Sequence, residues 1–132
     1  MNMAKTIERF EDLDVWKLAI ESANTIYDVT SVGKFSQDYI LRDQITRAAV
    51  SIFSNIAEGF ERDGNKEFCN FLSIAKGSCG EARAQAMFAR NRGYISDAEY
   101  SLIAEKLAQT NKQTSGFRNY LRKTDLKGRK FS

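Results

Sequence analysis

The sequence predicts an all-α protein, an antiparallel up-down-up-down four-helix bundle, and three observations support this prediction. The 132 residues contain no proline, which permits long unbroken helices. Apolar residues recur at alternating spacings of three and four positions, the pattern of a helix with one buried stripe. Turn signals that contain glycine separate these segments, and connections of about three to five residues favour antiparallel neighbours. We therefore expect one domain over residues 1–132, with helices at about 11–32, 37–62, 66–92 and 97–123.

The first predicted helix, 11–32, has a regular apolar face that consists of Leu13, Trp16, Ile20, Ala23 and Tyr27. Gly33 follows this helix and suits the left-handed conformation that often ends a helix. Ser36 precedes the second predicted helix and is a favourable N-cap residue.

The second predicted helix, 37–62, has an apolar face that is wider than a bundle requires. At about 100° per residue its apolar residues sweep an arc of roughly 180°, whereas a helix in a monomeric bundle needs a stripe of only about 100°. These residues are Leu41, Ile45, Ala48, Ala49, Ile52, Phe53, Ile56, Ala57 and Phe60. The extra width indicates that this helix contacts a second molecule as well as its own bundle, so we expect a homo-oligomer.

The third predicted helix, 66–92, is rich in small residues. Its apolar stripe consists of Phe68, Leu72, Ala75, Cys79, Ala82, Ala86 and Ala89. A glycine inside a helix costs about 1 kcal/mol relative to alanine. We therefore expect another backbone to pack closely against Gly77 and Gly80, the alternative being that both glycines are merely tolerated. The fourth predicted helix opens with Ser96, and Glu99 three positions later completes a capping-box pattern.

A polar stripe lies opposite the apolar face of helix 37–62 and consists of Arg47, Ser51, Asn55 and Glu58. It has three interpretations: a hydrogen-bonded seam between subunits, a solvated helix face, or a ligand-binding or catalytic patch. Serine and asparagine are poor helix formers, which favours the seam. Glu81 in the next helix flanks the core stripe and needs a partner if it is buried. Arg47 is the candidate because a guanidinium can bind both carboxylate oxygens.

The composition argues against an enzyme. The absence of histidine removes the commonest general base and the commonest metal ligand. Glu58 with Glu81 is formally an acid/base pair, but no nucleophile motif or phosphate loop accompanies it. Cys69 and Cys79 are ten residues apart in one predicted helix, a rise of about 15 Å, which is beyond the reach of a disulfide. We expect no cofactor, no metal site and two buried thiols in a reducing compartment.

Nothing in the sequence predicts a membrane partner. No apolar run approaches the length of about 18 residues that a membrane helix needs, and the first residues lack the apolar region of a signal peptide. We therefore expect a cytoplasmic protein.

The C-terminal end is basic, although the formal net charge of the whole chain is only +3. Its basic residues are Arg118, Arg122, Lys123, Lys127, Arg129 and Lys130, against the single acidic residue Asp125. Clustered cations bind phosphates and release counterions, so these six residues are the candidate contacts to RNA or DNA. The alternative is a solvated tail, from about residue 122 to residue 132, that keeps the protein soluble.

Three segments of the chain resemble a known family. They are FEDLDVWKLAIE (10–21), QITRAAVSIFSNIAEGFER (44–62) and KEFCNFLSIAKGSCGEARAQ (66–85). In combination they resemble the bacterial four helix bundle protein family, also called 23S ribosomal-RNA intervening-sequence proteins, over about residues 10–95. The basic end lies outside the shared pattern.

The resemblance implies a homopentameric ring of four-helix bundles, in a family whose biochemical activity is unsettled. A relative, the accessory variability protein of diversity-generating retroelements, is understood to bind nucleic acid and its reverse transcriptase. Phe53 departs from the pattern because members often have proline there, so a proline kink is not expected. The matching motif positions, which look architectural rather than catalytic in the family, are Arg47, Ser51, Asn55, Glu58, Gly59, Gly77, Ser78 and Glu81.

These observations together predict a non-enzymatic homopentameric scaffold that binds RNA or DNA through the basic residues. The alternative is an adaptor ring that docks a protein partner, such as a reverse transcriptase or a ribosomal component.

Overall fold

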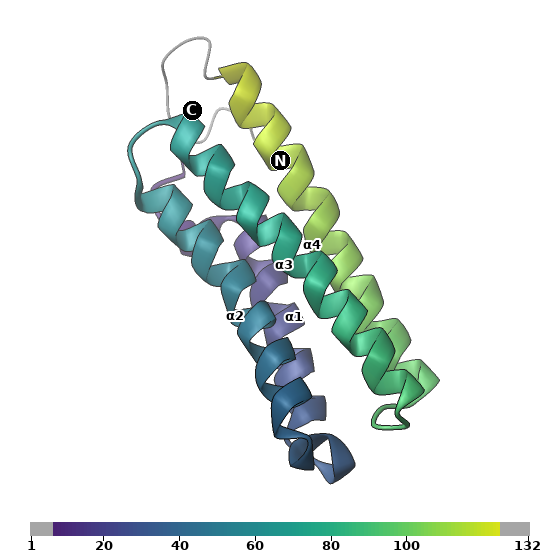
Figure 1. Cartoon of the computed structure of the whole chain (residues 1–132). Coiled ribbons are helices and arrows are strands. Elements are labelled where there is room, and N and C mark those ends of the chain that lie inside the picture. Colours follow the sequence, from purple (N-terminus) through teal and green to yellow (C-terminus); the bar gives the residue numbers. More distant parts are fainter. Residues whose placement is uncertain (1–6, 125–132) are drawn as a thin grey trace.

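The computed structural model describes residues 7–124, and this part of the chain contains four long α-helices and no strand. The helices are α1 (Asp14–Thr30), α2 (Tyr39–Glu61), α3 (Asn65–Asn91) and α4 (Asp97–Thr124), and they are shown in Figure 1. Two short 3-10 helices, η1 (Phe10–Asp12) and η2 (Gly33–Gln37), precede α1 and α2. The all-α prediction is confirmed, and the observed helix bounds lie within three residues of those expected from the sequence.

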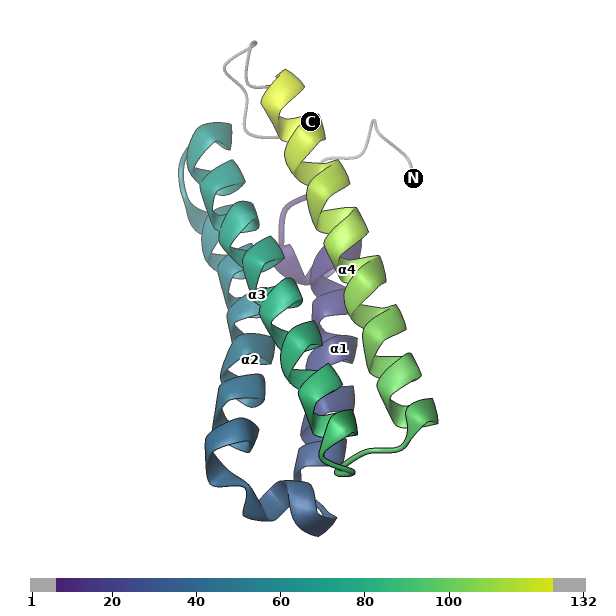
Figure 2. The same ribbon diagram turned by 45° about the vertical axis from the view of Figure 1, so that its right-hand side comes forward.

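The four helices pack around one core. Each helix contacts the helices before and after it in the chain, and α1 closes the circle by contacting α4. The connection between α2 and α3 lies at the same end of the molecule as the end of α4, whereas η2 and the α3–α4 connection lie at the opposite end (Figures 1 and 2). The molecule therefore has four long outer faces, each formed by two neighbouring helices.

The buried side of α3 is the one predicted, since all seven residues of its apolar stripe are buried. The buried side of α1 differs from the prediction. Ser22 and Ile26 are buried and the Ser22 hydroxyl lies 3.1 Å from the Thr110 hydroxyl of α4, so α1 is rotated toward α4. As a result Tyr27, predicted in the core, is 48% exposed, and Trp16 is only half-buried.

The start of α2 also differs from the prediction. Asp38, not Ser36, caps the helix, because its Oδ1 atom accepts a hydrogen bond from the Leu41 backbone N–H at 3.0 Å. Ser36 belongs to η2, and its hydroxyl donates to the Gly33 carbonyl at 2.6 Å. The buried Phe35 side chain anchors η2 in the core and delays the start of the α-helix by one short turn.

The capping box of α4 is confirmed, since the Glu99 backbone N–H donates to the Ser96 hydroxyl at 3.0 Å and the Ser96 backbone N–H donates to the Glu99 carboxylate at 2.8 Å. At the other end of α4 the buried Asn65, the first residue of α3, donates its side-chain amide to the Leu121 carbonyl at 3.2 Å. This bond ties the start of α3 to the end of α4.

The glycine that packs closely is Gly59 in α2. A Cβ built on Gly59 lies 2.7 Å from a ring carbon of Phe68 and 2.8 Å from the Phe71 Cβ, so α3 approaches α2 closely there. At Gly77 and Gly80 no atom of the described residues, apart from the adjoining residues and nearby backbone of α3 itself, lies within 4 Å of such a Cβ. Close packing at Gly77 and Gly80 is therefore absent within this part of the chain, because both glycines lie on the outer surface of α3. It stays a prediction only for contact with another molecule.

Candidate functional site

A small hydrogen-bond network joins α2 to α3 on their shared outer face. The Ser78 hydroxyl of α3 donates to the Ser51 hydroxyl of α2 at 2.8 Å. The Asn55 amide, one turn along α2, donates to the Ser51 carbonyl at 2.7 Å and to the Ser51 hydroxyl at 3.0 Å. Ser51 and Asn55 of the predicted polar stripe are thus half-buried and bonded within the chain, and they fix how α2 and α3 align.

The charged members of the predicted seam behave differently. Glu58 forms an ion pair with Arg62 at 2.7 Å, and both side chains are about half exposed. Arg47 and Glu81 are exposed, and among the described residues they form no ion pair with each other. The suggested Arg47–Glu81 pair is therefore wrong for the single chain. Because Glu81 lies on the surface, water solvates its carboxylate and no buried charge has to be compensated.

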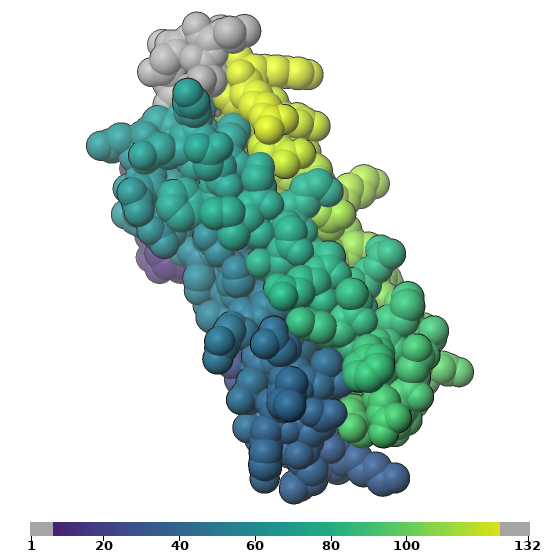
Figure 3. Space-filling model, in the orientation of Figure 1, coloured from purple at the N-terminus to yellow at the C-terminus, as the bar shows by residue number. Residues whose placement is uncertain are grey.

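Large apolar side chains lie along the same outer face of α2 and α3 as this network. Residues three, four or seven positions apart lie on the same side of a helix. The side of α3 that is next to α2 therefore carries Ile74, Gly77, Glu81 and Phe88, and the facing side of α2 carries Ile40 and Arg47. Ile40 is 81% exposed, and Ile74 and Phe88 are each about half exposed. We call this the seam face, and Figure 3 shows α2 and α3 side by side on the corresponding side of the molecule.

The predicted basic residues fall into three groups. Arg118 is half-buried, and its guanidinium donates to the Ser73 hydroxyl of α3 at 3.0 Å. Its Nε atom is buried without a hydrogen-bond partner among the described residues. Arg122 and Lys123 in the last turn of α4 are exposed. Lys127, Arg129 and Lys130 lie outside the described residues. Arg118 therefore packs against α3, whereas Arg122 and Lys123 face solvent.

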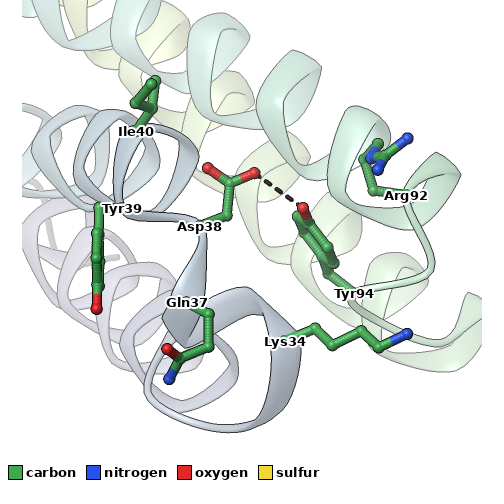
Figure 4. Close-up of a pocket in the computed structure, with 7 residues that line it drawn as sticks. All are labelled: Lys34, Gln37, Asp38, Tyr39, Ile40, Arg92 and Tyr94. Atoms are coloured by element: carbon green, nitrogen blue, oxygen red, sulfur yellow. Dashed lines mark hydrogen bonds between the residues drawn. The ribbon is translucent and has the colours of Figure 1, made fainter.

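A hollow lies at the opposite end of the molecule, where α2 begins and α3 ends (Figure 4). Its residues are Lys34, Gln37, Asp38, Tyr39, Ile40, Arg92 and Tyr94. The Tyr94 hydroxyl donates to the Asp38 Oδ2 atom at 2.9 Å. The Leu41 backbone N–H and the Tyr94 hydroxyl together hold the pKa of Asp38 below its ordinary value. The Asp38 carboxylate is already occupied by these contacts, so the hollow acts as a junction that joins η2, α2 and the α3–α4 connection.

The described residues offer little for catalysis or metal binding. No group of three or more histidine, cysteine, aspartate or glutamate residues lies together in the region 7–124 in a way that could hold a metal ion. Cys69 and Cys79 are buried thiols, and burial raises the pKa of the Cys79 thiol to about 12, so this sulfur is protonated at neutral pH. No helix in the same region is long and apolar enough to cross a membrane.

These features define an all-α protein of four long helices that carries a polar seam on one face and exposed cations at the end of α4. The family model of the 23S rRNA-intervening sequence protein matches residues 11–116, and the chain belongs to this family. The resemblance drawn from the three sequence segments is thereby confirmed.

Solved structures include a similar fold. It is a crystal structure of a protein of unknown function from the S23 ribosomal protein family of Bacteroides thetaiotaomicron, 23% identical, with a TM-score of 0.72. The match covers 79% of the present chain and 97% of that chain, so the shared fold includes nearly all of the other protein. No curated protein matches the present chain.

Sequence reasoning missed two structural contacts. The sequence predicts a turn at Asp63, Gly64 and Asn65, yet the Asn65 side chain is buried and binds α4. The Asp38–Tyr94 hydrogen bond joins residues 56 positions apart. Local spacing signals cannot predict such a pair, although a polar residue beside an expected helix start is a cap candidate in each case.

Proposed function

We propose that this protein is a non-enzymatic, self-associating scaffold that binds RNA or DNA through phosphate contacts at the C-terminal end of α4. The main support is the exposure of Arg122 and Lys123 in the last turn of α4, directly before the segment that holds Lys127, Arg129 and Lys130. The described residues pair neither side chain with a carboxylate. Both cations are therefore available to bind phosphate oxygens.

Self-association supplies the affinity that the few cations at the basic end of one chain lack. The exposed Ile40, Ile74 and Phe88 of the seam face support association, because large apolar side chains exposed on one outer face are typical of interaction sites. The assembly that the family resemblance implies is a closed homopentameric ring of antiparallel four-helix bundles. Such a ring carries five copies of the basic end, and linked weak sites bind a long polyanion far more tightly than one site does.

The names of the family and of the similar structure suggest the first probe, since one refers to a 23S rRNA intervening sequence and the other to a ribosomal protein family. A labelled RNA stem-loop and a DNA duplex of equal length should both bind, because phosphate contacts carry little sequence information. Affinity should fall steeply with salt, with a slope of log K against log salt of about −0.9 per phosphate contact.

Two matched double variants test this proposal by fluorescence anisotropy. Arg122→Gln with Lys123→Gln should weaken binding and reduce the salt slope, because two cations per chain are lost. Arg83→Gln with Lys112→Gln removes two exposed cations from the middle of α3 and α4 and should leave binding almost unchanged. Equal losses in the two variants, or an affinity that is flat between about 50 and 200 mM salt, would contradict binding through the basic end.

The second candidate function is a protein-docking adaptor, and the exposed apolar seam face favours it. Deletion of residues 122–132 separates the two functions. A nucleic-acid scaffold loses RNA binding on deletion, whereas an adaptor retains its protein partner.

A further inference from the structure

A second outer face of the bundle also carries exposed apolar side chains. On α1, Trp16, Ile20 and Tyr27 lie on the flank that points away from α4, since the opposite flank holds the Glu21–Lys106 ion pair between α1 and α4 at 3.2 Å. On α2, Tyr39 and Phe53 are 14 residues apart and share one flank. Phe53 lies about 200° around α2 from Ser51, so this flank is turned away from α3. We call the resulting outer face of α1 and α2 the aromatic face.

The described residues leave most of the aromatic face uncovered. Tyr39 is 60% exposed and Tyr27 is 48% exposed, while Trp16, Ile20 and Phe53, farther along the same two helices, are half-buried. η1 lies against α1 and α2, where Phe10 packs edge-on against the Trp16 ring at 5.2 Å, and covers only one end of the face. The Arg42 guanidinium lies over the Tyr39 ring, 4.8 Å from its centre.

The aromatic face and the seam face are neighbours that share α2. Because the four helices form a closed circle of contacts, two adjacent outer faces point roughly at right angles to each other. A head-to-tail ring of four or five copies needs two contact faces that subtend roughly 90° to 108°, whereas opposite faces would produce an open filament. The position of the two apolar faces thus suits a small closed ring.

The two faces also complement each other chemically. The aromatic face offers two tyrosines, whose rings are apolar and whose hydroxyls can both donate and accept hydrogen bonds. The seam face offers exposed Arg47 and Glu81 as partners for such hydroxyls. Gly77 lies between Ile74 and Glu81 with no atom of the described residues within 4 Å of a Cβ built there, which leaves room for an aromatic ring.

We propose that the seam face of one copy binds the aromatic face of a second copy. This head-to-tail contact, repeated from copy to copy, covers both apolar faces and closes a ring in which α2 of each copy takes part in both contacts. This inference rests on the proposed self-association and specifies the two surfaces that meet. An interface of the seam face with itself would leave Tyr27 and Tyr39 uncovered in a dimer.

A mixing experiment with two blocked variants tests the pairing. Ile74→Glu with Phe88→Glu blocks the seam face, and Tyr27→Glu with Tyr39→Glu blocks the aromatic face. All four residues are about half exposed or more, so the charges are tolerated by the fold, and circular dichroism checks that each variant stays helical. Met87→Glu with Leu102→Glu is the matched control, because these two exposed residues lie outside both faces.

Each blocked variant alone should sediment as a monomer of about 15 kDa, given the 15.0 kDa chain. An equimolar mixture should form a dimer of about 30 kDa, because the intact aromatic face of one variant can still bind the intact seam face of the other. The control variant should keep the wild-type mass. A blocked variant that dimerises alone, or a mixture that stays monomeric while wild type assembles, overturns the pairing. Wild type that sediments as a monomer instead overturns the proposed self-association.

Discussion

Replacement of Gly59 by alanine should destabilise the protein, although alanine is the better helix former. A Cβ at this position would lie 2.7 Å from a Phe68 ring carbon and 2.8 Å from the Phe71 Cβ. The ring of Phe68 is fully buried and the Phe71 Cβ is fixed to the backbone of α3, so α3 has to move away from α2. Overpacking of this kind costs about 1–3 kcal/mol. The gain in helix propensity is about 1 kcal/mol.

The expected net effect of G59A is therefore a loss of up to about 2 kcal/mol in the free energy of unfolding. Gly116 in α4 is the matched control, since no atom of the described residues lies within 4 Å of a Cβ built there. G116A should increase the stability by about 0.5–1 kcal/mol. Urea unfolding at one fixed protein concentration measures both variants, because the stability of an oligomer depends on concentration. If G59A proved as stable as G116A, the close approach of α2 and α3 at this point would be refuted.

Three further predictions concern contacts of the described residues. Asp38→Asn should lower the melting temperature at neutral pH. Because the folded pKa of Asp38 is depressed, the carboxylate stabilises the protein above its ordinary pKa of 3.8, and this stabilisation is lost as the pH falls through the folded pKa. Below about pH 4 the melting temperature of the variant should therefore change less with pH than that of the wild type. Asn65→Ala removes the donor to the Leu121 carbonyl and should cost about 1–2 kcal/mol, with faster amide exchange in the last turn of α4 and unchanged exchange in α1 as the control. In a C69A variant the remaining Cys79 thiol, whose pKa is about 12, should react with a thiol reagent at pH 8 only after denaturant is added, and rapid reaction of the folded protein would contradict its burial.

The helices were predictable because their signals are local. The alternation of apolar residues at three and four positions located all four α-helices, and the Ser96–Glu99 capping box marked the start of α4. Gly33, expected in the left-handed region after the first helix, has a φ of 61°. Each of these features depends on residues within about one helical turn of one another, where stereochemistry acts directly.

The remaining errors concern rotation and long-range contact. Tyr27 fits the apolar spacing of α1, but the Ser22–Thr110 contact with α4 rotates the buried stripe past it. Gly59, Gly77 and Gly80 are all helical glycines, and only the approach of Phe68 and Phe71 from α3 distinguishes the first of them. Sequence spacing fixes which residues share a helix face, whereas the neighbouring helix decides which face is buried.

The candidate site was predicted in part. Ser51 accepts a hydrogen bond from Ser78 of α3 within the chain, and Asn55 donates to Ser51 inside α2. Whether the seam face also joins subunits stays a prediction, as do the pentamer, the cytoplasmic location and the nucleic-acid contacts of the basic end.

Sedimentation velocity on the wild-type protein at micromolar concentration tests the central claim most directly. Self-association into a pentameric ring predicts one species near 75 kDa, five times the mass of the 15.0 kDa chain. A single well-folded species of about 15 kDa over the same concentrations would show that the apolar faces around α2 need no second copy, and would contradict the scaffold and its multivalent binding of nucleic acid.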